Sequence, residues 1–163
     1  MATTSLGGNP VQTVGELPAV GSAAPSFDLV GADMSPVTRP EGTRTVLNIF
    51  PSVDTGVCAA SVRKFNELAA GLNDTTVINV SQDLPFAQAR FCGAEGIDKV
   101  VTASAFRSSF GDDYGVRMTD GKLAGLLARS VVVLDADGNV IHEQLVPEIA
   151  SEPDYDAAVA ALS

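Results

Sequence analysis

The chain reads Thr45-Val46-Leu47-Asn48-Ile49-Phe50 and then Pro51-Ser52-Val53-Asp54-Thr55-Gly56-Val57-Cys58. The first six residues predict a buried strand, because they are mainly apolar or β-branched. The next residues predict a tight loop, and a periodic pattern that continues to about residue 72 predicts a helix with Cys58 in its first turn. Cys58, Val62 and Phe65 share one stripe of this helix, so we expect the sulfur to face the core.

The segments around this unit extend the same pattern. A second β-branched run over residues 76–80 completes a strand–helix–strand unit, so the two strands should be parallel. We expect short helices over residues 84–93 and 104–110, a hairpin around Ala136-Asp137-Gly138, and a closing helix over residues 155–162. Before them come a Gly/Pro-rich arm over residues 1–25 with a turn near Gly7-Gly8, and a short strand near residue 28. These elements predict an α/β fold.

Composition limits the domain count and the classes of partner. The 163 residues are 45% apolar, enough for one domain, residues 1–163, without disulfide or metal staples. A net charge of −10 argues against nucleic acid as a partner, because a duplex-binding protein needs a basic face. The chain has no basic residue before Arg39 and no apolar run near the ~20 residues that span a bilayer. We therefore expect a cytoplasmic protein without membrane insertion.

The cysteines admit two interpretations. At a helix N-terminus, free N–H groups and the helix dipole favour the thiolate of Cys58, which is the nucleophilic form. A cysteine without further context is more often a small buried hydrophobe, and Cys92 near the end of the next helix is open to the same interpretation. In the cytosol, where disulfides are usually catalytic or sensing, two cysteines indicate redox chemistry or no chemistry at all.

Several segments resemble the peroxiredoxins, and specifically their thiol peroxidase subfamily. Pro51 and Thr55-x-x-Cys58 match the peroxiredoxin active loop, and further matches occur in order along almost the whole chain. These matches are Thr13-Val14-Gly15-Glu16-Leu17-Pro18, Gly21-x-x-Ala24-Pro25-x-Phe27, Ser61-Val62-Arg63-Lys64-Phe65, Asp83-Leu84-Pro85-Phe86-Ala87-Gln88-Ala89-Arg90-Phe91-Cys92-Gly93-Ala94-Glu95-Gly96, Ala124-Gly125-Leu126-Leu127-Ala128-Arg129 and Glu148-Ile149-Ala150-Ser151-Glu152-Pro153-Asp154-Tyr155. The resemblance implies a thioredoxin-like fold, with an N-terminal extension or hairpin and a central mixed sheet flanked by helices. It also implies a homodimer and thioredoxin as the reductant.

The resemblance also implies roles for single residues. Cys58 would attack a hydroperoxide and become a sulfenic acid, and Cys92 would condense with it to an intramolecular disulfide. Thr55 would hold the thiolate, Arg129 would stabilise the developing charge, and Pro51 would shield the pocket from water. From residue type alone, Arg129 would be a solvated surface charge and Pro51 a strand terminator.

Arg63, Gly56 and His142 say less about the function. Arg63 is a weaker candidate for a supporting role near the site, and Gly56 stands where the peroxiredoxin loop usually has a proline. His142, the only histidine, is interpreted as a surface residue rather than as the base of a Cys–His hydrolase. No zinc-ligand spacing or phosphate-binding glycine loop is present, so we expect no cofactor.

Two alternatives to a peroxidase that uses hydrogen peroxide and alkyl or lipid hydroperoxides stay open. A thioredoxin-type oxidoreductase would need Cys-x-x-Cys, whereas the chain has Cys58-Ala59-Ala60-Ser61. A redox sensor or disulfide-exchange protein would use the same two cysteines without multiple turnovers.

Overall fold

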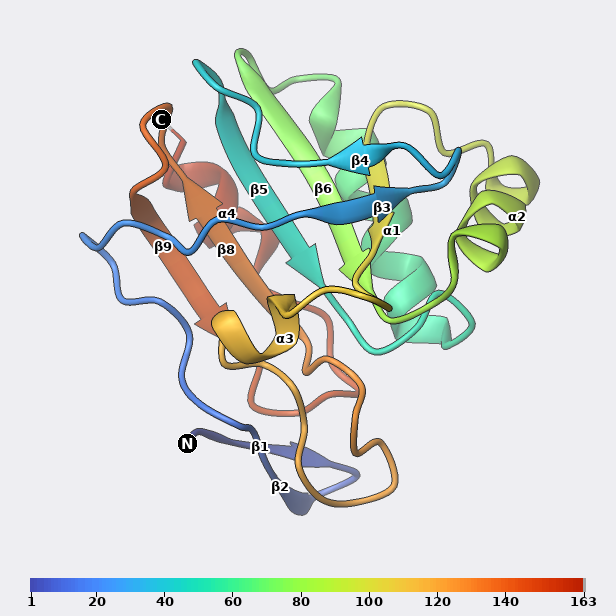
Figure 1. The fold of residues 1–163 in the computed structure, drawn as a ribbon, viewed down its shortest axis with the longest axis vertical. Coiled ribbons are helices and arrows are strands. Elements are labelled where there is room, and N and C mark those ends of the chain that lie inside the picture. The colour runs from blue at the N-terminus through green and yellow to red at the C-terminus, as the bar shows by residue number, and fades with distance from the viewer. Residues whose placement is uncertain (163) are drawn as a thin grey trace.

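The computed structural model describes residues 1–162; Ser163, which ends the expected domain, lies outside the described residues. Within them, a mixed seven-stranded sheet has the order β4-β3-β7-β6-β5-β8-β9 (Figure 1). β5, β6 and β7 are parallel, and the other neighbours are antiparallel. The strands are β3 (Leu29–Gly31), β4 (Pro36–Val37), β5 (Arg44–Ile49), β6 (Thr75–Ser81), β7 (Val101–Ser104), β8 (Ser130–Leu134) and β9 (Val140–Leu145). The predicted α/β fold with a central mixed sheet is confirmed.

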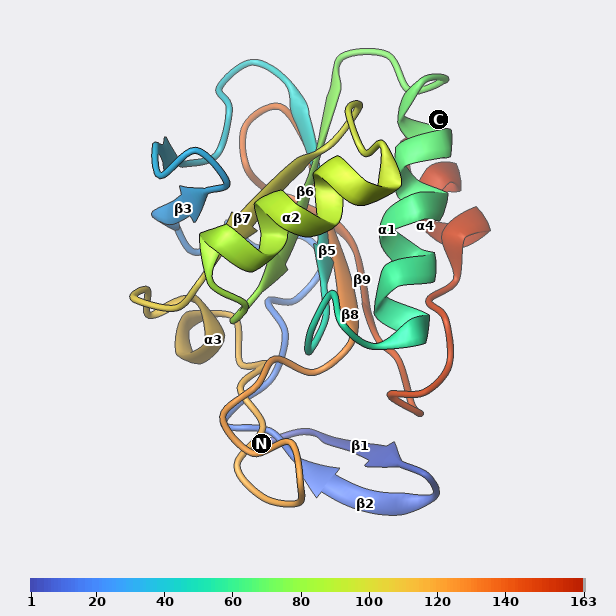
Figure 2. The same cartoon turned by 90° about the vertical axis from the view of Figure 1, so that its right-hand side faces the viewer.

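Two helices cover one face of this sheet, α1 (Gly56–Ala69) and α4 (Tyr155–Ala160) (Figure 2). The ring of Phe65 on α1 meets that of Tyr155 edge-on at 5.2 Å between centroids, and Val46 and Val133 lie in the same cluster. The helix α2 (Pro85–Glu95) packs beside α1 through Phe91. The predicted stripe of α1 does face the core, because its buried residues include Cys58, Val62 and Phe65.

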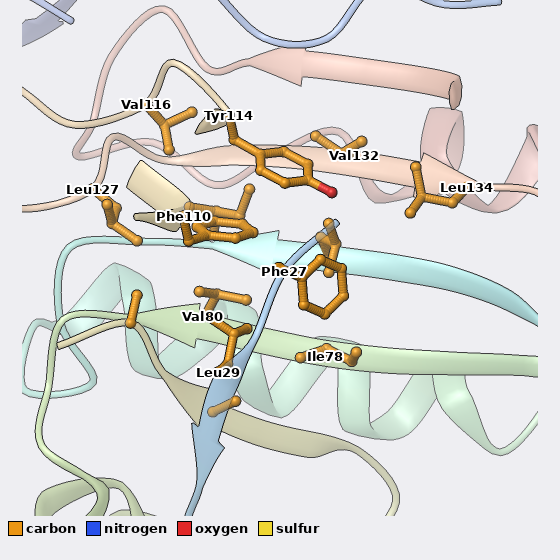
Figure 3. Close-up of a cluster of buried hydrophobic side chains, with 14 of the residues drawn as sticks. Phe27, Leu29, Ile78, Val80, Phe110, Tyr114, Val116, Leu127, Val132 and Leu134 are labelled. Carbon is orange, nitrogen blue, oxygen red and sulfur yellow. The ribbon is translucent and has the colours of Figure 1, made fainter. Parts of the chain in front are cut away.

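The opposite face of the sheet carries the largest apolar cluster, closed by the short helix α3 (Phe110–Asp113) (Figure 3). Phe110 and Tyr114 stack at 4.3 Å between centroids, and Phe27 meets both rings edge-on. The hydroxyl of Tyr114 donates to the Pro25 carbonyl at 2.7 Å, which holds the N-terminal segment on this cluster. Burial raises the pKa of Tyr114 well above its ordinary value.

The predicted N-terminal arm begins as a hairpin, β1 (Thr3–Leu6) and β2 (Asn9–Gln12). Its turn is made by Gly7 and Gly8 at φ +60° and +85°, a conformation that suits glycine. The hairpin lies beside the long segment between α3 and β8 (Figure 1). Thr13, just after the hairpin, forms an isolated β-bridge with Met118 of this segment.

The prediction of a helix over residues 104–110 is wrong. Val101–Ser104 forms β7, and α3 begins only at Phe110. β7 runs parallel to β6 and antiparallel to β3. Long-range pairing on both sides therefore makes residues 101–104 a strand. Among residues 1–162, no helix is long and apolar enough to cross a membrane.

Candidate active site

Cys58 lies in the first turn of α1, which follows β5 after a short loop. Thr55 is the N-cap residue of α1 with extended backbone angles (φ −98°, ψ 146°), and its carbonyl accepts the Ala59 amide at 3.0 Å. The Cys58 side chain is fully buried and packs among Phe50, Val62 and Phe91. The sulfur therefore combines a helix N-terminus with an apolar environment, as the sequence predicts.

Arg129 is the charged residue that reaches this sulfur. Its Nη2 lies 3.1 Å from the Cys58 Sγ, and its Nε donates to the Ile149 carbonyl at 2.7 Å. The residue is only 1% exposed, so it is not the solvated surface charge that its residue type alone suggests. β8 brings it here, because Ser130 pairs with Ile49 at the end of β5.

The charge of Arg129 is incompletely compensated by protein groups. Its Nη1 is buried and has no hydrogen-bond partner within residues 1–162, and no carboxylate there forms a salt bridge with it. A buried charge is costly unless it is paired, and a thiolate at Cys58 supplies the opposite charge at contact distance. The unused Nη1 donor is available to an oxygen that approaches the sulfur.

A cavity of about 160 Å³ adjoins these groups. It brings together Pro51, Thr55 and Arg129, three of the residues singled out in the sequence, with mostly apolar neighbours. The complete lining is Leu6, Pro51, Thr55, Gly56, Val57, Leu123, Arg129, Ile149 and Ala150. The Thr55 hydroxyl donates to the Ser52 carbonyl at 3.2 Å instead of contacting the Cys58 sulfur.

Cys92 is half-buried near the end of α2 and belongs to the same apolar cluster as Cys58. Both thiols are free, so the structure is the dithiol form. The Cys92 thiol donates to Thr102 Oγ1 at 3.4 Å. Gly96 ends the helix in the left-handed conformation, and the amides of Gly96 and Ile97 both donate to the Cys92 carbonyl.

Asp83 is a site-organising residue that the sequence analysis missed. Its carboxylate accepts hydrogen bonds from the Ser52 hydroxyl at 2.7 Å, the Val53 amide at 2.8 Å and the Ser81 hydroxyl at 2.6 Å. It thus connects the loop before Cys58 to the start of α2. An Asp just before a helix is usually interpreted as an N-cap, but Leu84 is the N-cap residue here, so the sequence carries no signal for this contact.

Other candidates lie away from the sulfur. Arg63 forms an exposed salt bridge with Glu95 of α2 at 3.0 Å, and among the described residues it makes no hydrogen bond to Cys58. His142 is half-buried on β9 rather than at the surface, and its Nε2 has no hydrogen-bond partner in the described part of the chain. Residues 1–162 contain no group of three or more side chains that could hold a metal ion.

Comparison with known proteins places this chain in a family. The Redoxin family model matches residues 19–159. The thiol peroxidases of Mycobacterium tuberculosis and Corynebacterium glutamicum are 61% and 57% identical to this chain, over 99% and 100% of both sequences respectively. The chain belongs to the thiol peroxidase subfamily of the peroxiredoxins. It is therefore a thiol-dependent peroxidase.

The structural comparison agrees with this family. A crystal structure of a peroxiredoxin-like protein from Aquifex aeolicus superposes with a TM-score of 0.95 at 42% identity, covering 99% of this chain and 96% of that one. The Chromobacterium violaceum thiol peroxidase, at 22% identity and a TM-score of 0.90 over 98% of this chain and 94% of its own, has the same fold. The predicted thioredoxin-like fold of this thiol peroxidase is confirmed.

Proposed function

We propose that Cys58 and Cys92 perform the peroxidase cycle of this chain. The Cys58 thiolate attacks the distal oxygen of a hydroperoxide, the O–O bond breaks, and water or an alcohol leaves. Cys58 is then a sulfenic acid, with which the Cys92 thiol condenses to form a disulfide and release water. The contact of 3.1 Å between Arg129 Nη2 and the Cys58 sulfur is the observation that carries the proposal.

We assign to the positive charge of Arg129 the stabilisation of both the Cys58 thiolate and the transition state. Negative charge develops on the leaving oxygen as the O–O bond breaks, and a preorganised buried donor stabilises it without reorganising. The free Nη1 supports this role, because both of its N–H groups remain unused while Nε and Nη2 bond Ile149 and Cys58. Thr55 and Pro51 line the same cavity; Thr55 is assigned a contact with the bound peroxide and Pro51 the exclusion of water.

We assign both hydrogen peroxide and organic hydroperoxides as substrates. The walls contributed by Leu6, Leu123 and Ile149 are apolar and suit the alkyl part of an organic hydroperoxide. Thioredoxin as reductant, a homodimer and a cytoplasmic location follow from the resemblance to the subfamily. Exposed apolar side chains at Leu84 and Phe86, 51% and 70% exposed, support an association surface at the start of α2.

Peroxide consumption with thioredoxin and its reductase tests the cycle. The wild type should consume many equivalents of peroxide, whereas Cys58→Ser should consume none, because a serine hydroxyl is not ionised at neutral pH. Cys92→Ser should react with about one equivalent and then stop. A Cys92→Ser variant with normal thioredoxin-supported turnover would remove Cys92 from the cycle. Stoichiometric consumption by the wild type would favour the redox sensor instead.

A further inference from the structure

A row of buried polar side chains crosses the sheet beneath α1 and α2. Asn48 of β5 stands opposite Asn79 of β6, which stands opposite Thr102 of β7. Asn48 Nδ2 donates to Asn79 Oδ1 at 2.9 Å, and Asn79 Nδ2 donates to Thr102 Oγ1 at 3.4 Å. The two asparagines are fully buried, and Thr102 is 5% exposed. These three side chains are called the polar row below.

The two ends of the polar row lie at the two cysteines. Thr102 Oγ1 accepts the hydrogen bond from the Cys92 thiol at 3.4 Å. Asn48 Nδ2 also donates to Ser61 Oγ on α1 at 3.3 Å, and the Ser61 hydroxyl donates to the main-chain carbonyl of Cys58 at 2.8 Å. An uninterrupted set of hydrogen bonds therefore connects the backbone at Cys58 with the thiol of Cys92.

Core packing does not require polar residues at these positions. Val46, Phe50 and Val77 belong to apolar clusters beneath the helices and show that aliphatic or aromatic side chains fill this space. Buried amides and hydroxyls stabilise a core only when they are paired, and Asn48 Oδ1 is left without a partner among the described residues. The polar row is thus a costly way to fill the core, and its ends coincide with the helix turns that carry the thiols.

We expect these turns to move when the disulfide forms, because in this form both thiols are free and each lies within a helix. The Cα atoms of a disulfide lie within about 7 Å of each other. Cys58 lies near the start of α1 and Cys92 near the end of α2, and both helices are intact in the dithiol form. When the end of α2 unwinds, the hydrogen bond from Cys92 to Thr102 is broken.

We propose that the polar row, through Thr102, retains Cys92 in its packed position and thereby limits the rate of disulfide formation. Thr102 is a positioning residue, and its role rests on the cycle proposed above. In the step concerned, Cys92 Sγ attacks the sulfur of the Cys58 sulfenic acid, the S–S bond forms and the S–O bond breaks. The hydroxyl leaves as water with the proton of the Cys92 thiol. Loss of the Thr102 hydroxyl makes the unwound conformer more populated.

The test compares Thr102→Val with wild type in a single turnover with peroxide. Acid quenching and intact-mass measurement separate sulfenic acid from disulfide and so give the rates of oxidation and of disulfide formation. Since one hydrogen bond changes an equilibrium by about two- to tenfold, disulfide formation should be faster by that factor while oxidation is unchanged. Thr102→Ser restores the hydroxyl and should restore the wild-type rate. Thr102→Ala replaces Thr102→Val if the latter does not fold.

Thr45→Val is the matched control. Thr45 is also a fully buried threonine of the sheet, but its hydroxyl has no hydrogen-bond partner among residues 1–162. Its replacement should leave disulfide formation unchanged. Unaltered or slower disulfide formation in Thr102→Val, or equal rates in the Val and Ser variants, overturns the role of the polar row.

A second measurement is independent of peroxidase chemistry. In a Cys58→Ser background no Cys58–Cys92 disulfide can form, and alkylation by iodoacetamide reports the exposure of Cys92 alone. Adding Thr102→Val should accelerate this alkylation by about two- to tenfold, and Thr102→Ser should not. If wild type forms no Cys58–Cys92 disulfide, the proposed cycle and the effect of Thr102 on its rate both fail, and the alkylation rates still decide whether Thr102 retains Cys92 in its packed position. Equal alkylation in the Val and Ser variants overturns this retention.

Discussion

At the scale of single residues, the buried guanidinium of Arg129 dominates the site. A charge that is 1% exposed, with only a carbonyl and the Cys58 sulfur as hydrogen-bond partners among the described residues, is costly to bury. The same arrangement places a positive charge against the Cys58 sulfur and leaves the N–H groups of Nη1 for the departing oxygen. Binding of the thiolate and stabilisation of the transition state are assigned to one side chain.

Arg129→Ala should slow the oxidation of Cys58 by about a hundred- to a thousandfold, because one well-placed donor to a developing oxyanion is worth about that much. Single-turnover oxidation of the reduced variant measures this step. Arg107→Ala is the control, since Arg107 lies over the exposed ring of Phe106 and outside the cavity of the site. Reduction of the disulfide by thioredoxin should be unaffected. Oxidation at the wild-type rate in Arg129→Ala would exclude the assigned role.

Arg129 also shows where inference from residue type ends. An arginine just before a strand is normally solvated, and only the resemblance of residues 124–129 to the thiol peroxidases indicated otherwise. Its burial results from the pairing of β8 with β5, whose residues are about 80 positions apart along the chain. Cys58, in contrast, could be placed by local patterns alone, because its strand, loop and helix are contiguous.

At the scale of elements, two kinds of contact connect the loop before Cys58 with α2. Asp54 of this loop pairs with Arg90 of α2, but their side chains are 63% and 64% exposed, and such pairs contribute about 0–1 kcal/mol. Asp83 instead accepts the amide of Val53, a residue that is 2% exposed. The buried contact should therefore organise the loop, and the surface ion pair should matter little.

Asp83→Ala should lower the free energy of unfolding of the reduced protein by about 1–3 kcal/mol, because it leaves the buried Val53 amide without its acceptor. Urea unfolding measures the change. Asp98→Ala should stay within about 0.5 kcal/mol of wild type, since Asp98 is exposed and has no hydrogen bond or salt bridge among the described contacts. Equal losses in the two variants would show that the connection to the loop is not what stabilises the fold.

The elements also differ in how far sequence could predict them. The sequence predicts α1 well, because its apolar stripe and the two strands that flank it in the sequence both indicate a strand–helix–strand unit. Residues 101–104 are too short for a period to be recognised, and β7 exists because Thr102 and Ala103 pair with Asn79 and Val80 of β6. The polar row escaped prediction for the same reason, because its members are adjacent only across three strands.

At the scale of the whole molecule, the N-terminal hairpin completes the site. Leu6 of β1 lines the cavity together with Pro51 and Thr55, although it lies far from them in the sequence. Glu148 connects the hairpin to the loop after β9 by accepting hydrogen bonds from the Gly8 amide and the Ala150 amide, both at 2.9 Å. Ile149, whose carbonyl accepts Arg129 Nε, lies in that loop.

Acid should weaken this connection. The hydrogen bonds from the amides of Ala150 and Gly8 hold the pKa of Glu148 below its ordinary value of 4.5. Because the folded-state pKa is the lower one, the stabilisation is fully present above about pH 4.5 and is lost as the pH falls through the folded-state pKa. Glu148→Gln should accordingly be less stable than wild type at pH 7, and the two should converge in acid. Urea unfolding across this pH range measures the difference.

Glu143→Gln separates this effect from the general loss of a carboxylate. Glu143 is exposed on β9 and its carboxylate accepts no hydrogen bond among the described contacts, so its replacement should leave the wild-type pH dependence in place. Hydrogen exchange of residues 3–12 locates the change, because protection of the hairpin should fall in Glu148→Gln already at pH 7. A stability difference between wild type and Glu148→Gln that stayed constant from pH 7 to pH 3 would mean that the carboxylate does not hold the hairpin against the site.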